Sequence, residues 1–361
     1  MARMTVRARH GITALLLVLA AVLAGCTRTP GSGWGEIAPS RFLAVANAAF
    51  GGPHGIVTVD ARSGRTKPFP LHLSAAKSLA VTGMAFDQGR NLWVSSASGP
   101  VCTSRVAGCG PQQHSCAGQI ERIDRRSGTS RVVYRATREE RIDGVSPNPS
   151  ADQIAFLTGQ CDRSYLNQHI RVQRVGGRAF DVGAGLLVCH RLAVPVWLSG
   201  DRLAAVYQPA SSTTIEPEYG HGVCSTPARG GVAVFAAAPT PDLPPPTSLD
   251  PECQPAAIAS TPDGLDAIVA CGPEPGLPYG PAKLIVTDQT LHARQTTPVG
   301  SCTNGASIAA DHIGDIAMST YDYCGRPGED PHTVVFVVKK GAARTLSDLR
   351  GGTLALDHLA W

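Results

Sequence analysis

Cysteine is the residue type that offers the widest range of chemistry in this chain of 361 residues, which contains 11 cysteines. Thiolates hold metal ions when they occur in tight CxxC or CxxH pairs. No such pair occurs, because the closest cysteines are seven residues apart. We therefore expect no metal site, and we expect disulfides from an even set of ten cysteines. That set is Cys102, Cys109, Cys116, Cys161, Cys189, Cys224, Cys253, Cys271, Cys302 and Cys324.

Catalytic patterns are missing from the sequence. It contains no GxSxG, HExxH, P-loop or EF-hand pattern, and its 11 histidines are scattered. Glu216, Glu218 and His221 could meet Asp322 or Asp330, but their spacing matches no known metal site. We therefore predict no catalytic residue, no metal and no cofactor.

The eleventh cysteine, Cys26, lies at the end of an N-terminal export signal. Residues 1–10 are basic, and residues 11–24 form an apolar run that suits a signal peptide but is too short to span a bilayer. The run ends in Leu23-Ala24-Gly25-Cys26, which resembles the bacterial lipoprotein box. The alternative is an ordinary signal peptide with a chance cysteine.

This resemblance implies that the bond before Cys26 is cut and that its thiol receives a diacylglyceryl group, often with a further acyl chain such as palmitate on the new amine. Residues 1–25 are then a removed signal peptide, and residues 26–40 are a lipidated cysteine with a flexible tether rich in Gly, Ser and Pro. Acyl chains of this number hold a protein lastingly to a membrane.

The pattern of residues 41–361 indicates repeated β-structure. Short β-branched runs bounded by Gly, Pro, Asp and Ser recur in blocks about 50 to 60 residues apart, as in TGMAFDQGRNLWVSS (82–96) and AAIASTPDGLDAIVAC (256–271). A four-stranded unit at this period is typical of a β-propeller blade. Asp60, Asp124 and Asp288 occupy matching places, where we expect them to brace turns.

The two ends of the predicted propeller together supply the strands of one blade. The first block lacks an innermost strand, and the segment LALDHLAW (354–361) resembles a first strand without a successor. We predict an all-β fold, a six-bladed β-propeller closed by this C-terminal strand, which would leave no exposed sheet edge at the joint.

One turn, Thr261-Pro262-Asp263-Gly264, resembles the SPDG repeats of TolB-like propellers, which share their general plan with WD40-like ones. The resemblance implies a fold over residues 41–361. It does not imply a shared role, because there is no room for the additional α/β domain of TolB itself.

The ten cysteines map to one face of such a ring. Loops after the second strand of a blade and loops between blades lie on the same side, and each of these cysteines lies in or beside such a loop. Three pairs would join the start of a first strand to the end of a second strand: Cys253–Cys271, Cys302–Cys324 and, across a longer loop, Cys189–Cys224. The other four allow three pairings, of which we favour Cys102–Cys109 with Cys116–Cys161.

Five of the seven tyrosines fall in the same loops. Tyrosine offers a large amphipathic surface at a small cost in entropy and is common in recognition surfaces. The disulfides either support long loops or also preorganise a binding surface. The ligand-binding candidates are Tyr165, Tyr219, Tyr279, Tyr321 and Tyr323.

The charge is weak and balanced, with 32 Lys+Arg against 28 Asp+Glu, so we expect no nucleic-acid partner. We predict a lipoprotein anchored to the cell membrane on its extracytoplasmic side. Its propeller would be a non-enzymatic binding or scaffold module for an envelope protein, peptide or glycan. The alternative is an extracytoplasmic propeller enzyme of the lactonase, lyase or quinone-dependent dehydrogenase type, with polar side chains gathered on the central channel.

Overall fold

The structure is a computed structural model, and it describes a defined part of the chain. The described residues are 37, 40–48, 55–69, 71, 79–98, 118–137, 140–160, 168–183, 190–209, 230–240, 243–261, 263–272, 280–322, 332–348 and 354–361. This part consists of strands and turns and contains no helix. Accordingly, it has no helix that could cross a membrane. The predicted signal peptide and Cys26 lie outside the described residues.

Three antiparallel sheets have four strands each. The first is formed by both ends of the chain, in the order β23 (Leu354–Ala360), β1 (Arg41–Ala48), β2 (Gly55–Asp60) and β3 (Thr66–Pro68). The second contains β4 (Leu79–Phe86), β5 (Leu92–Ser98), β6 (Gly118–Ile123) and β7 (Ser130–Arg135). The third contains β8 (Glu140–Pro147), β9 (Gln153–Gln160), β10 (His169–Arg174) and β11 (Ala179–Asp181).

A fourth sheet is less regular. Its strand β14 (Arg202–Pro209) pairs with β15 (Gly231–Ala236) on one side, and on the other with β12 (His190–Leu192) and β13 (Val196–Leu198). In place of an outer strand, a single bridge joins Val232 to Thr247. The segment 243–246 before Thr247 contains three prolines, which have no N–H for a ladder.

The fifth sheet has seven strands, and this differs from the separate blocks that the sequence predicts. It runs through β16 (Gln254–Ser260), β17 (Asp266–Gly272), β18 (Gly280–Asp288), β19 (Ala293–Ala310), β20 (Ile316–Asp322), β21 (His332–Lys339) and β22 (Ala342–Asp348). The reason is β19, an 18-residue strand. Its first part pairs with β18 and its last part with β20, so the link between two predicted blocks stays extended.

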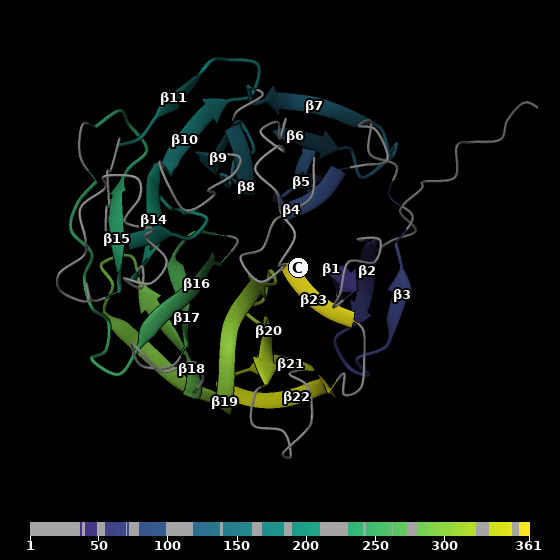
Figure 1. Ribbon diagram of the computed structural model, residues 1–361, viewed down its shortest axis with the longest axis vertical. Helices are drawn as coiled ribbons and strands as arrows, with labels where there is room; N and C mark the ends of the chain where they lie inside the picture. Colours follow the sequence, from purple (N-terminus) through teal and green to yellow (C-terminus); the bar gives the residue numbers. More distant parts are fainter. Residues whose placement is uncertain are drawn as a thin grey trace, which may run out of the picture.

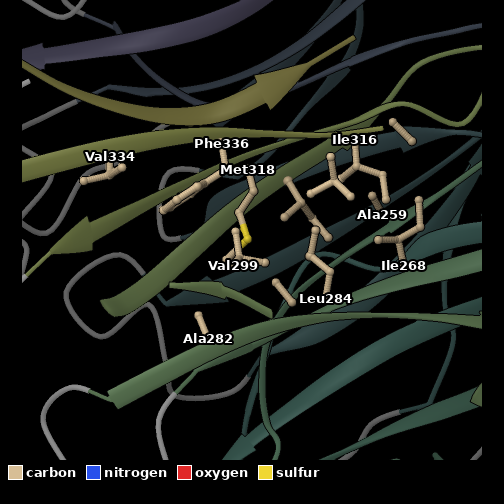
Figure 2. Close-up of a cluster of buried hydrophobic side chains, with 13 residues drawn as sticks. Ala259, Ile268, Ala282, Leu284, Val299, Ile316, Met318, Val334 and Phe336 are labelled. Carbon is tan, nitrogen blue, oxygen red and sulfur yellow. The ribbon is translucent and has the colours of Figure 1, made fainter. Parts of the chain in front are cut away.

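This long sheet folds back on itself at β19. Side chains of β16–β18 pack against side chains of β20 and β21 in one buried cluster, with Leu284, Ile268 and Val299 facing Met318 and Phe336 (Figure 2). The two halves of the sheet therefore lie face to face, as two neighbouring units of a ring would.

The sheets are arranged around a common centre, with β4, β8, β16 and β23 nearest to it (Figure 1). The predicted closure is confirmed, because β23 pairs antiparallel with β1 from Leu43 opposite Ala360 to Ala48 opposite Leu354. The chain therefore ends beside the strand with which the ring begins.

The predicted bracing role of three aspartates is also confirmed. The carboxylate of Asp60 accepts hydrogen bonds from the backbone N–H and the hydroxyl of Ser63, at 2.8 and 2.9 Å. Asp124 does the same with Ser127, and Asp288 does so with Thr290. The hydroxyl of Thr290, followed by the backbone donors, lowers the pKa of Asp288 to about 2. These turns are local structures, which is why the sequence reveals them.

The strands nearest the centre share an irregularity that the sequence does not reveal. In five of them, the register against the next strand shifts at one point: at residues 81–83, 143–146, 255–257, 304–307 and 357–360. In the fourth sheet, residues 193–195 interrupt the strand between β12 and β13. Bulges of this kind bend a strand and increase its twist.

Candidate binding face

The three described cysteines lie at the same end of their sheets. Cys253 directly precedes β16, and Cys271 is the next-to-last residue of β17. Cys302 lies in β19 beside Thr303, which pairs with the last residue of β20. We call this end of the sheets the cysteine face: the ends of β5, β9, β14, β17 and β20 with the starts of β6, β10, β15, β18 and β21.

Cys253 and Cys271 form the disulfide that the sequence predicts, with their Cα atoms 5.0 Å apart. Both are buried, and they pack against Ile285 and Leu249. A bond that closes 18 residues restricts the unfolded chain and contributes about 3 kcal/mol. It links the start of β16 to the end of β17.

Cys302 also forms a disulfide, but its predicted partner Cys324 lies outside the described residues. The other predicted disulfide cysteines lie outside them as well: Cys102, Cys109, Cys116, Cys161, Cys189 and Cys224. Of the five candidate tyrosines, Tyr321 is described, at the end of β20, and it is half-buried. Tyr165, Tyr219, Tyr279 and Tyr323 are outside the described part of the chain.

A row of polar side chains crosses the cysteine face beside Tyr321. Thr303 of β19 pairs with Asp322 of β20, and Asp322 pairs with His332 of β21. Residues directly opposite each other in an antiparallel sheet project to the same side, so these three side chains lie together. Thr320, two residues before Asp322, projects to that side too. We call this set the polar row.

Two hydroxyls of the polar row have unused hydrogen-bonding capacity. Thr303 and Thr320 are 2% and 1% exposed, and the Oγ1 atoms of both are buried without a hydrogen-bond partner. The same is true of the Oγ of Ser96, near the end of β5 on this face. A buried hydroxyl without a partner costs free energy, so such atoms call for an explanation, such as a polar group that reaches them from outside.

A second polar group on this face, the side chain of Arg171, is occupied by hydrogen-bond partners within the protein. The guanidinium of Arg171 donates to Asp181 at 2.7 Å, to Glu140 at 2.8 and 3.0 Å, and to the hydroxyl of Tyr134 at 2.8 Å. Burial alone would lower the pKa of Arg171, but its bonds to Asp181 and Glu140 raise it above its ordinary value. With these partners in place, Arg171 joins the second and third sheets and is not available to a ligand.

The sequence does not indicate most of the polar row. It suggests Asp322 only as a possible metal-ligand partner of Glu216, Glu218 and His221, which lie outside the described part. Thr303, Thr320 and His332 have no motif, and only the alternation T-Y-D at the end of a strand hinted that Thr320 and Asp322 share a side. Among the described residues there is no group of three His, Cys, Asp or Glu side chains that could hold a metal ion.

Comparison with known proteins reveals a shared fold. No protein-family model matches the chain, and no curated protein is similar to it in sequence. A periplasmic gluconolactonase from Pseudomonas aeruginosa is similar in structure, with a TM-score of 0.50 and 14% identity over 85% of this chain and 82% of that one.

Two further solved structures are similar at a lower level. A protein of Agrobacterium tumefaciens assigned to TolB has a TM-score of 0.47 and 11% identity, over 87% of this chain and 90% of that one. An oligogalacturonate lyase in complex with manganese has a TM-score of 0.47 and 12% identity, over 86% and 74%. Sequence identities this low say nothing about the activity of this chain. The chain has a propeller-like, all-β fold.

Proposed function

We propose that the protein is a membrane-anchored extracytoplasmic lipoprotein whose six-bladed propeller binds a protein, peptide or glycan through the cysteine face. Support for six blades comes from the strand order. Four sheets supply one blade each, and the seven-stranded sheet supplies two that share β19. Pairing of β23 with β1 gives the first blade its inner strand.

The observation that carries the binding role is the pair of buried, unpartnered hydroxyls of Thr303 and Thr320 at the end of the sheets where the described cysteines lie. A ligand with polar groups would satisfy both hydroxyls. A disulfide at the base of a loop reduces the ordering cost of binding, because the loop ends are already held together. Tyr321 lies between Thr320 and Asp322 in β20, and its half-buried ring projects to the opposite side of that strand.

Lipidation of Cys26 is tested by metabolic labelling with an alkyne derivative of palmitate. We expect the full chain to become labelled and to remain with the membrane after a high-salt wash. The Cys26→Ala chain should carry no label, because the thiol that starts the modification is missing. If the Cys26→Ala chain is labelled as strongly as the parent, the anchor is assigned to the wrong residue.

The binding role is tested by photo-cross-linking in intact cells. A benzophenone amino acid at Tyr321 should capture one specific neighbour, which mass spectrometry identifies. The control places the same group at Arg131, an exposed position of the outer strand β7 beside the β6–β7 turn, at the end of the sheets away from the cysteine face. If both positions capture the same products, or neither captures any, Tyr321 does not lie at a binding site.

The second candidate function is an extracytoplasmic enzyme of the lactonase or lyase type. The observation in its favour is that Asp322 lies directly opposite His332, because a carboxylate beside an imidazole is suited to proton transfer. Turnover of a sugar lactone or an oligogalacturonide by the purified protein, lost in Asp322→Asn, would favour this alternative over the binding role.

A further inference from the structure

The end of the sheets opposite the cysteine face consists of tight turns, and we call it the turn face. Hydrogen bonds join neighbouring turns, within one sheet or between adjacent sheets. Arg125 N–H donates to the side chain of Asn91 at 3.2 Å, and Ser199 N–H donates to the carbonyl of Gly264 at 2.9 Å. Arg344 of β22 donates to the carbonyl of Ala61 at 3.1 Å. Turns of adjacent sheets are therefore in direct contact on this face.

Four outer turns of this face each carry two exposed basic side chains. These turns are β2–β3, β6–β7, β10–β11 and the end of β21 with the β21–β22 turn, and the basic residues are Arg62, Arg65, Arg125, Arg126, Arg174, Arg178, Lys339 and Lys340. Together they form an arc across neighbouring parts of the ring, from β21–β22 past β2–β3 to β10–β11 (Figure 1).

Acidic side chains offset only part of the charge of this arc, in which Lys339 forms an ion pair with Asp315. Asp60 and Asp124 are turned onto the backbone N–H groups of their own turns, and only Asp124 of the two is exposed. The other exposed carboxylates of the described turns are Asp152, Asp201 and Asp263. Asp152 adjoins the arc, because the N–H of Val175 in the β10–β11 turn donates to its carbonyl at 2.8 Å, so the exposed basic side chains outnumber the exposed carboxylates without being free of them. The exposed part of the turn face is therefore net positive, although the chain as a whole is nearly balanced.

The two large apolar side chains that are exposed in the described part of the chain also lie on the turn face. Leu265, in the β16–β17 turn, is 52% exposed, and Ile313, in the β19–β20 turn, is 70% exposed. Each would lose unfavourable contact with water if it entered the boundary of a bilayer.

The chain reaches the ring at this face. Arg41, the first residue of β1, pairs with Asp60, and the N–H of Ala61 donates to the carbonyl of Ser40 at 2.7 Å. Ser40 therefore lies beside the β2–β3 turn, within the basic arc. Thirteen residues lie between Cys26 and Ser40.

We infer that the turn face lies on a bilayer that contains anionic phospholipid, so that the cysteine face points away from the membrane. This inference adds a contact surface to the lipid anchor of the proposed function and rests on it for orientation. A basic surface beside an acyl anchor forms a second membrane signal, because each basic residue near an anionic surface is attracted to it.

The test uses a chain that begins at Thr27. It retains every described residue and carries no lipid, so its binding does not depend on acylation of Cys26. Sedimentation with vesicles of phosphatidylcholine and phosphatidylglycerol measures affinity, and vesicles of phosphatidylcholine alone are the reference. We expect binding to the mixed vesicles that weakens with salt and much weaker binding to the neutral ones.

Matched variants locate the surface. Arg126→Ala, in the β6–β7 turn, should lower the affinity for mixed vesicles about fivefold. Arg135→Ala removes the same charge from the same hairpin at its opposite end, and it should change the affinity less than twofold by the same electrostatic argument. Ile313→Ser should also weaken binding, whereas the fold is retained because this side chain is exposed.

The outcomes separate this inference from the proposed anchor. If the chain from Thr27 fails to prefer mixed vesicles, or if the variants at Arg126 and Arg135 behave alike, the turn face is not a membrane surface, whatever the state of Cys26. If vesicle binding follows the expected pattern while Cys26 takes up no palmitate label, the surface stands and the lipid anchor is refuted.

Discussion

A chain that ends at Thr353 should not fold into a stable domain. The residues removed, 354–361, form the strand β23 and Trp361, and they close the ring against β1. Circular dichroism during heating should display no cooperative transition for the truncated chain, and size-exclusion chromatography should reveal aggregates.

The size of this effect follows from what the last strand buries. Leu356, Leu359, Ala360 and Trp361 are 6% exposed or less, and the ring of Trp361 lies 5.5 Å from that of Phe42. Loss of one such large side chain costs about 3–5 kcal/mol, and total stabilities are about 5–15 kcal/mol.

Hydrogen bonds across the joint are lost as well. Ser319 Oγ donates to the carbonyl of Leu356 at 2.6 Å, and the N–H of Leu359 donates to Ser307 Oγ at 2.9 Å. The edge of β1 would also be exposed and free to recruit other chains. The control is a chain that lacks residues 27–34, none of which belongs to a described strand. If the chain without 354–361 melts at the temperature of the full chain, β23 does not close the ring.

Replacement of Gly144 by alanine should destabilise the protein by about 3 kcal/mol or more. Gly144 lies at the bulge of β8 with φ +73°, a left-handed backbone that disfavours a side chain. A Cβ placed there would be 2.1 Å from one methyl of Val194 and 2.9 Å from its Cβ. Valine is stiff at χ1, so its side chain cannot turn away. Chemical denaturation of both proteins measures the difference.

Gly176 supplies a matched control. Its φ is +80°, and a Cβ placed there would meet nothing within 4 Å. Gly176→Ala should therefore cost only about 1 kcal/mol, which is the price of the backbone conformation alone. In addition, Val194→Ala should restore part of the stability lost in Gly144→Ala, because it removes the colliding methyls. Equal losses at Gly144 and Gly176, without rescue, would refute the crowding at the bulge.

Local patterns explain the part of the fold that the sequence predicts. Alternation within strands and Asp-Gly turns act over a few residues, so β4–β5, β16–β17 and the turns at Asp60 and Asp124 are recognisable without coordinates. The Cys253–Cys271 bond is predictable for the same reason, since both residues belong to one hairpin.

Pairing register and surface placement depend on residues far apart in the chain. The bulge at Gly144 packs against Val194, 50 residues later, and DGVSP alone does not indicate this contact. The continuous β19 results from pairing with strands on both of its sides. The polar row likewise depends on the pairing registers of three strands, so no sequence motif predicts it.

The amino-acid sequence by itself determined which segments are strands, which turns are braced, and which strand closes the ring, because these depend on local patterning and on the count of strands. The tertiary structure alone decided where the charges lie. The sequence has a balanced, unclustered charge. Folding brings basic turns from distant segments onto one face. A surface potential is a sum over neighbours in space, and neighbours in space are set by the ring.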